Sequence, residues 1–176
     1  MEVFSGRPAG TDRDAVELRA YDLLDRLGID YLRVDHPPAL TMEDCVSIGA
    51  ALDAPVCKNL FLCNRQKTCF YLLLMEGDKP FKTKDLSAQL GIARLSFADE
   101  SAMTSLLGVH PGSVSPLGLE NDSEKRVQLV IDRVLLDNKR IGCHPCRNTS
   151  TVGFSTDDFL QKLLPALGHP PIFVRL

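Results

Sequence analysis

Long apolar runs are absent from this 176-residue sequence, and the longest contains Tyr71–Met75. A membrane-spanning helix needs about 18 consecutive apolar residues, so we expect no membrane span. The first dozen residues have neither a basic start nor an apolar stretch, so no secretory signal is expected either. The expected location is the cytoplasm, where the six cysteines remain thiols.

An excess of positive charge is also missing. The formal net charge is −3 and the isoelectric point is near 5.8. Proteins that bind DNA or RNA over large, sequence-independent surfaces are strongly basic, so the composition excludes that class and we expect no DNA partner. A local basic face remains compatible with the sequence, because an RNA substrate needs few phosphate contacts.

What is present is the composition of one folded domain. Hydrophobic residues make up 44% of the chain and charged residues 24%, and there is no internal repeat or low-complexity linker. We therefore expect a single domain over residues 1–176, with residues 1–10 as a loose tail.

Hydrophobic spacing, capping residues and turn residues predict the elements. A helix is predicted from Thr11-x-x-Asp14 to Gly28, and a second from Thr41-x-x-Asp44 to before Pro55. Further predicted helices cover 83–90, 99–107 and 155–167; predicted strands cover 29–34, 58–63, 68–75, 127–136, 141–144 and 172–176. Short turns join several strands, which indicates an α/β fold of the α+β type: one mixed, largely antiparallel sheet with flanking helices.

Cys143-His144-Pro145-Cys146 has the spacing of a redox pair or of half a zinc site. Zinc normally has four ligands, and the sequence has no second Cys-x-x-Cys and no His-x-x-x-His. The pair is also not followed by a helical pattern, as a thioredoxin-like pair would be. We therefore predict no metal and no cofactor, and interpret the two thiols as incidental neighbours of His144.

Two other features allow a structural or a functional interpretation. Lys58 opens an apolar strand beside Asn59, where it is either a solvated edge residue or an ammonium at a pocket mouth. The segment Gly112–Pro116 is either a turn or a loop whose glycine lets the backbone approach a ligand.

Taken together, four segments resemble a known family. They are Lys58–Leu62, Arg94–Ala98, Leu107–Pro116 and His144-Pro145-x-x-Asn148-x-x-Thr151. In this order they resemble the aminoacyl-tRNA editing domains related to the insertion domain of bacterial prolyl-tRNA synthetase, and most of all the free-standing alanyl-tRNA(Pro) deacylases. The resemblance extends from about His36 to the last strand.

The resemblance implies a hydrolase that removes alanine from proline tRNA without a metal or a covalent nucleophile. It implies catalytic roles for Lys58, Gly112 and His144, and substrate contacts from the residues around them: Asn59, Ser113, Val114, Ser115, Pro116, Asn148 and Thr151. It also makes prolyl-tRNA synthetase a candidate partner. Cys143 stands where relatives often have an aromatic residue, which leaves the preferred amino acid open.

Three points remain open at this stage. A deacylase for cysteinyl-tRNA(Pro) or another small aminoacyl-tRNA, and a non-catalytic module that binds tRNA or a synthetase, are the alternatives. His36 fits the family pattern, but its Pro-rich turn equally suits a structural role. For the acceptor stem we predict a basic face made by Lys79, Lys82, Lys84 and Arg94, although these could also form an ordinary solvated surface.

Overall fold

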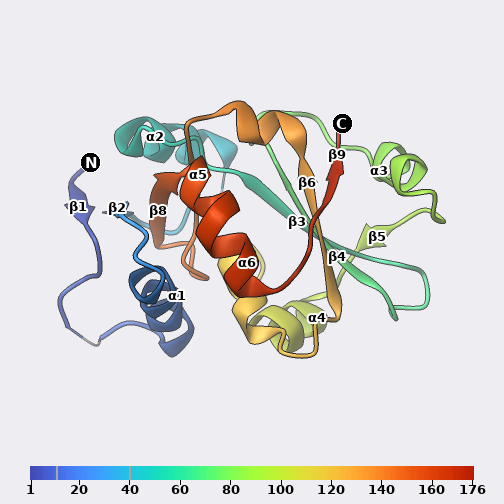
Figure 1. The fold of residues 1–176 in the computed structure, drawn as a ribbon, viewed down its shortest axis with the longest axis horizontal. Helices are drawn as coiled ribbons and strands as arrows, with labels where there is room; N and C mark the ends of the chain where they lie inside the picture. The colour runs from blue at the N-terminus through green and yellow to red at the C-terminus, as the bar shows by residue number, and fades with distance from the viewer. Residues whose placement is uncertain (11, 40) are drawn as a thin grey trace.

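The computed structural model describes residues 1–10, 12–39 and 41–176, and its strands form two sheets (Figure 1). One sheet has the order β1-β2-β8-β7 and is antiparallel throughout. Its strands are β1 (Val3–Ser5), β2 (Tyr31–Asp35), β8 (Ser150–Ser155) and β7 (Arg140–Cys143).

The second sheet has the order β5-β3-β4-β6-β9. Its strands are β5 (Ser96–Phe97), β3 (Lys58–Cys63), β4 (Phe70–Met75), β6 (Val127–Asp132) and β9 (Ile172–Val174). The β3–β4 and β3–β5 pairs are antiparallel, whereas β6 runs parallel to both β4 and β9. The predicted fold class, a mixed and largely antiparallel α/β fold, is confirmed, with two sheets in place of one.

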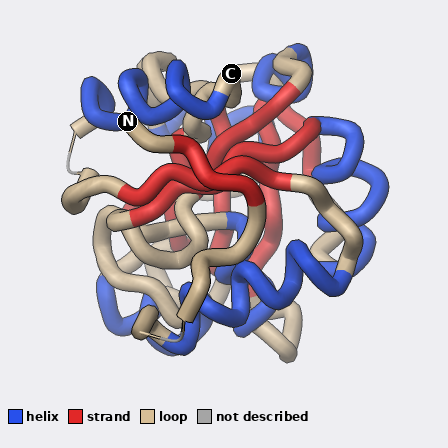
Figure 2. Tube along the Cα trace, turned by 90° about the vertical axis from the view of Figure 1, so that its left-hand side faces the viewer, coloured by secondary structure: helices blue, strands red, loops and turns tan. Residues whose placement is uncertain are grey.

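Helices surround the strands, which occupy the centre of the molecule (Figure 2). The longer helices are α1 (Ala15–Arg26), α2 (Met42–Leu52) and α3 (Thr83–Leu90). Short α4 (Glu100–Ala102) continues as the π-helix η1 (Met103–Leu107), and the C-terminal helix runs through α5 (Thr156–Asp158), η4 (Phe159–Leu163) and α6 (Leu164–Leu167). Within the described residues no helix combines the length and apolar character needed to cross a bilayer.

Capping side chains define where the helices begin. Thr41 and Asp44 form the predicted reciprocal capping box at the start of α2. In α1 the cap is Asp14, whose carboxylate accepts from the Val16 amide at 2.9 Å. Thr11, the predicted start of this helix, lies outside the described residues.

The strand period divides the core into layers. On β4, Leu72 and Leu74 point into the main core, whereas Leu73 and Met75 point to the opposite face, which α3 covers through Leu86. A third cluster lies between α2 and the first sheet. The main core fills the space between the two sheets and is closed by α1 and the C-terminal helix.

Two sequence predictions are wrong here. Residues Val3–Ser5 do not belong to a loose tail: they form β1, where Phe4 packs under the Arg33 guanidinium at 4.7 Å. The strand predicted over 127–136 ends at Asp132, because the buried Asp132 carboxylate accepts from the Val134 amide and starts the 3₁₀-helix η3 (Arg133–Asp137).

Among the strands of the described residues, β1, β5 and β8 were not predicted. β8 has the sequence Ser-Thr-Val-Gly-Phe-Ser, which lacks a clear alternation of apolar and polar residues, yet it lies in the middle of its sheet. Gly153 leaves room for the chain just after α2, since a Cβ at position 153 would lie 2.8 Å from the Ala54 Cβ.

Candidate active site

A pocket of about 220 Å³ lies where the two sheets meet. The chain just before β3 pairs with β7: the Cys57 amide donates to the Gly142 carbonyl at 2.8 Å, and the Gly142 amide donates to Pro55 at 2.8 Å. This contact brings the start of β3 beside the end of β7. The pocket is lined by Ala39, Thr41, Met42, Cys45, Val56, Cys57, Lys58, Asn59, Gly112, Val114 and His144.

Lys58 is the first residue of β3 and is half-buried. Its ammonium donates to the backbone carbonyl of Lys79 at 2.6 Å, so the side chain is held toward the loop that follows β4. Asn59 is held by its own backbone, because its amide group donates to the Cys57 carbonyl at 3.2 Å. An ammonium has three donors, and the contacts within the described residues use one of them, which leaves two for a ligand in the pocket.

Gly112 and Val114 form another wall of the pocket. Gly112 has a φ of +82°, a left-handed conformation that side chains rarely adopt. Neither the Gly112 amide nor the Val114 amide donates a hydrogen bond within the described residues. Both are therefore available to an oxyanion.

The remaining predicted loop residues lie behind this wall. Ser113, Ser115 and Pro116 are buried, and the Ser115 hydroxyl accepts from the Leu117 amide at 3.2 Å to cap the 3₁₀-helix η2 (Pro116–Asn121). Asn148 lies close to the pocket, 3.5 Å from where a Gly112 Cβ would be, and its amide group donates to the Ala39 carbonyl at 3.4 Å. These contacts support the pocket wall.

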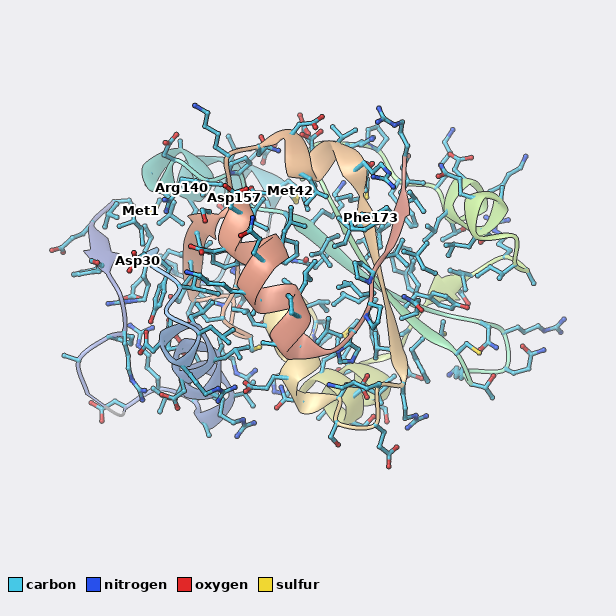
Figure 3. The ribbon with its side chains drawn as sticks, viewed as in Figure 1. Met1, Asp30, Met42, Arg140, Asp157 and Phe173 are labelled. Carbon is cyan, nitrogen blue, oxygen red and sulfur yellow. The ribbon has the colours of Figure 1, made fainter. Side chains whose placement is uncertain are left out.

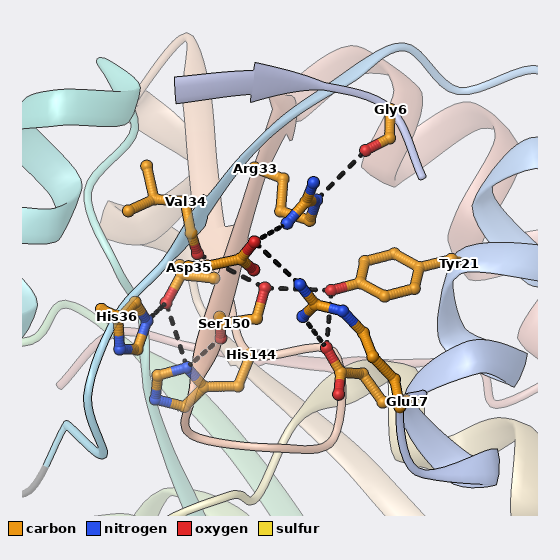
Figure 4. A network of polar contacts seen from close by, with 11 residues as sticks. Gly6, Glu17, Tyr21, Arg33, Val34, Asp35, His36, His144 and Ser150 are labelled. Atoms are coloured by element: carbon orange, nitrogen blue, oxygen red, sulfur yellow. Dashed lines mark hydrogen bonds and ion pairs between the residues drawn. The ribbon is translucent and has the colours of Figure 1, made fainter. Parts of the chain in front are cut away.

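His144 follows β7 and is 7% exposed. Its Nδ1 lies 2.9 Å from the Ser150 carbonyl oxygen and 3.1 Å from the Thr151 hydroxyl (Figure 4). Burial lowers the pKa of His144; the Ser150 hydrogen bond offsets part of this effect, and the nearby His36 lowers the pKa by a lesser amount. The lowered pKa favours the neutral imidazole at pH 7.

A polar network behind His144 extends into α1 (Figure 4). The Ser150 hydroxyl is 2.9 Å from the Tyr21 hydroxyl, which donates to Glu17 at 2.8 Å. Glu17 in turn pairs with Arg13 at 2.7 Å. The network ties the Ser150 carbonyl, and with it the orientation of His144, to a helix at the other end of the sequence.

Comparison with known proteins identifies the family of this chain. The family model described as the aminoacyl-tRNA editing domain matches residues 36–162. The chain belongs to the aminoacyl-tRNA editing domain family. It is therefore an aminoacyl-tRNA deacylase, a hydrolase, as the resemblance of its motifs implied.

Named relatives cover most of this editing domain. It is 34% identical over 146 residues to the prolyl-tRNA editing protein ProX of Acetoanaerobium sticklandii, covering 83% of this chain and 88% of the relative. It is 36% identical over 166 residues to prolyl-tRNA synthetase associated domain-containing protein 1 of Mus musculus, covering 90% and 96%. A solved structure of a candidate trans-editing enzyme for prolyl tRNA synthetase shares the fold, with a TM-score of 0.70, 16% identity and coverage of 94% and 99%.

The two cysteines of the Cys-x-x-Cys motif lie in the core. Cys143 and Cys146 are buried free thiols. Burial raises the pKa of Cys143 well above its usual range and that of Cys146 to about 12. Nucleophilic and metal-binding cysteines act as thiolates, so neither side chain is prepared for that chemistry.

The predicted basic residues divide into two groups. Lys82, Lys84 and Arg94 are exposed on or beside α3. Lys79 instead pairs with the fully buried Asp132 at 2.6 Å. The charge of Lys79 is thus already compensated by Asp132. The ion pair supports the loop after β4, whose Lys79 carbonyl holds the Lys58 ammonium.

Several pocket residues were missed from the sequence. Met42 and Cys45 of α2 line the pocket, and Met42 is labelled in Figure 3. They also line an adjoining hollow of about 440 Å³ that continues along α2 past Val46 to the loop containing Glu76. The capping box predicted this helix, but its weak amphipathic pattern did not indicate which face turns toward the site.

Proposed function

We propose that this editing domain hydrolyses the ester of a small amino acid, alanine by preference, wrongly attached to proline tRNA. The names of its relatives refer to prolyl-tRNA editing and to prolyl-tRNA synthetase. The observation that carries the proposal is the small pocket that unites Lys58, Gly112 and His144.

The residue types suit hydrolysis of an activated ester. Orientation and stabilisation of the developing oxyanion can provide most of the acceleration in such a reaction. Lys58, Gly112 and Val114 line one small space, and their N–H donors are suited to bind the carbonyl oxygen. Removal of one such donor typically costs about 10²–10³ in rate.

His144 is suited to handle the proton. Its Nδ1 faces the Ser150 carbonyl oxygen, which can only accept, so Nδ1 carries the hydrogen and Nε2 of the neutral ring carries a lone pair. That lone pair can accept a proton from the attacking water, directly or through the hydroxyl of the terminal ribose. Water then supplies the oxygen of the released acid, and the tRNA hydroxyl leaves with a proton.

Pocket size supports selection of a small side chain. At about 220 Å³ the pocket is smaller than the roughly 300–1,000 Å³ typical of small-molecule sites. Its apolar wall includes Ala39, Val56 and Val114, which are small and have little freedom to move aside. A methyl group fits such a wall better than the ring of proline. A second sieve is needed because a synthetase pocket discriminates only about 10–200-fold per methylene.

The deciding experiment compares deacylation of alanyl-, cysteinyl- and prolyl-tRNA(Pro) by the purified protein. We expect alanyl-tRNA(Pro) to be hydrolysed fastest and prolyl-tRNA(Pro) to be spared. Faster hydrolysis of cysteinyl-tRNA(Pro) would assign a different small substrate to the same site. Binding without hydrolysis of any of the three would contradict the proposal.

A further inference from the structure

His36 and His144 are joined by one hydroxyl group. The Thr151 Oγ1 lies 2.9 Å from His36 Nε2 and 3.1 Å from His144 Nδ1, and the two ring centroids are 6.0 Å apart. His36 comes from the end of β2 and His144 follows β7, whereas Thr151 lies on β8 between them. His144 lines the pocket, but His36 and Thr151 do not.

The direction of each hydrogen bond follows from the acceptors present. His36 Nδ1 is 2.8 Å from the Pro37 carbonyl oxygen, so Nδ1 carries the hydrogen. In the tautomer with hydrogen on Nδ1 alone, Nε2 can only accept, and Thr151 then donates its single proton to it. The Thr151 oxygen is left with lone pairs toward His144, so it reinforces the Ser150 carbonyl as an acceptor for the His144 Nδ1 hydrogen.

We propose that His36 is a positioning residue: acting through Thr151, it holds the hydroxyl proton away from His144 and keeps the His144 Nε2 free to accept a proton. The consequence for turnover rests on the proposed function, because it assumes that His144 acts on the ester. The arrangement of hydrogens does not depend on the substrate.

The backbone holds all three groups in register. Thr151 is fully buried and pairs with Val34 across the β2–β8 ladder. The His36 amide donates to the Thr149 carbonyl at 3.0 Å, so the ring of His36 stays opposite the Thr151 hydroxyl.

Without His36 the Thr151 proton has no acceptor on that side. It can turn toward His144 Nδ1, which then has to give up its own hydrogen. The His144 ring would carry its proton on Nε2 in a larger fraction of molecules, and that fraction could donate to the ester but could not accept a proton. The binding of the aminoacyl group would change little, because neither residue lines the pocket.

The test uses His36→Leu and Thr151→Val. Their conservative counterparts are His36→Gln, which retains a hydrogen-bond acceptor, and Thr151→Ser, which retains the hydroxyl group. Thr156→Val is the matched control, since Thr156 is a buried threonine whose hydroxyl donates to the Asn138 carbonyl away from the histidines. We expect kcat on the preferred aminoacyl-tRNA to fall about three- to tenfold in the first two variants, which is the size of one net hydrogen bond, with KM nearly unchanged. The Gln and Ser variants should recover most of the rate.

Nitrogen NMR of the histidine rings gives a readout that needs no substrate. We expect His144 to be protonated on Nδ1 in the wild type and in Thr156→Val, and to shift toward protonation on Nε2 in His36→Leu. Thr151→Val has no hydroxyl proton to turn toward His144, so its His144 should keep the hydrogen on Nδ1, facing the Ser150 carbonyl, and lose only the second acceptor. An unchanged His144 tautomer in His36→Leu would overturn the inference, as would a Thr151→Val rate equal to that of Thr156→Val. If a non-conservative variant does not fold, a wild-type tautomer with hydrogen on Nε2 would still overturn it. If the wild type does not deacylate any of the substrates but the His144 tautomer shifts as expected, the proposed function is refuted and the inference about His36 still holds.

Discussion

The ammonium of Lys58 lies 2.6 Å from the backbone carbonyl oxygen of Lys79. The Lys79 ammonium is itself 2.6 Å from the carboxylate of Asp132, which is fully buried at the end of β6. The position of Lys58 is thus set by a chain of contacts that runs from β3 through the loop after β4 to β6. A lysine held in this way loses little further freedom when it binds an oxyanion.

Lys58→Ala should lower deacylation by at least about 10²-fold, because it removes a donor to the developing oxyanion. The fold should persist, since Lys58 is only half-buried and its truncation opens no core cavity. Rates on alanyl-tRNA(Pro) and thermal melts would be measured together, with Lys139→Ala, an exposed lysine, as the control. Wild-type turnover in Lys58→Ala would remove this residue from the mechanism.

Changes at Gly112 and His144 should affect the size sieve in opposite directions. Gly112→Val forces a branched side chain into a left-handed conformation and into the pocket, so activity on alanyl-tRNA(Pro) should fall at least ~10²-fold. His144→Ala should enlarge the pocket, slow the alanine reaction and raise the relative rate on prolyl-tRNA(Pro). Full activity of Gly112→Val, or a wild-type preference for the prolyl ester, would contradict the sieve.

The exposed residues beside α3 are expected to contact tRNA phosphates. Charge reversal at Lys82, Lys84 or Arg94 should weaken tRNA binding and reduce its salt dependence by about one unit of slope per lost phosphate contact. Lys79→Met should behave differently: it leaves a buried carboxylate without its cation and should lower the free energy of unfolding by about 2–3 kcal/mol. Equal salt slopes for wild type and the α3 variants would place the RNA on another face.

His144 makes stability depend on pH. Its pKa in the folded protein is lowered, mainly by burial, so protons bind more tightly to the unfolded chain. The contribution of His144 is complete above about pH 6.5 and is lost as the pH falls through the folded-state pKa, by at most about 1.4 kcal/mol per pH unit. Urea titrations of wild type and His144→Gln from pH 5 to 8 would measure it. Identical pH slopes for the two proteins would exclude this linkage.

The paired thiols should be dispensable for catalysis. Replacement of Cys143 and Cys146 by serine should leave kcat within a few-fold of the wild type, because both thiols are buried and protonated at neutral pH. Stability should fall, since two hydroxyl groups replace apolar sulfur in the core. Stoichiometric zinc in the purified protein, or loss of turnover without loss of folding, would favour a metal or redox role.

Local patterns sufficed for much of the fold. The capping box at Thr41 and Asp44, the hairpin over 58–75 and the helix 83–90 with its glycine stop depend on residues close in the chain, so their signals are readable without tertiary contacts. The motif residues Lys58, Gly112 and His144 were also recognisable in the sequence, because each has a distinctive neighbour: a strand start, a Pro-Gly turn and a His-Pro step.

Tertiary structure decided the rest. β8 was missed because its place in the middle of a sheet depends on β2, which lies far away in the chain, and its own residues show no clear period. Lys79 could not be distinguished from Lys82 by sequence, since its partner Asp132 lies 53 residues away. The sequence by itself determined the family and indicated three residues that line the candidate pocket. The pairing of strands that are distant in the chain determined the volume of the pocket. It also formed the Lys79–Asp132 ion pair beside Lys58, and it placed the Thr151 hydroxyl between His36 and His144.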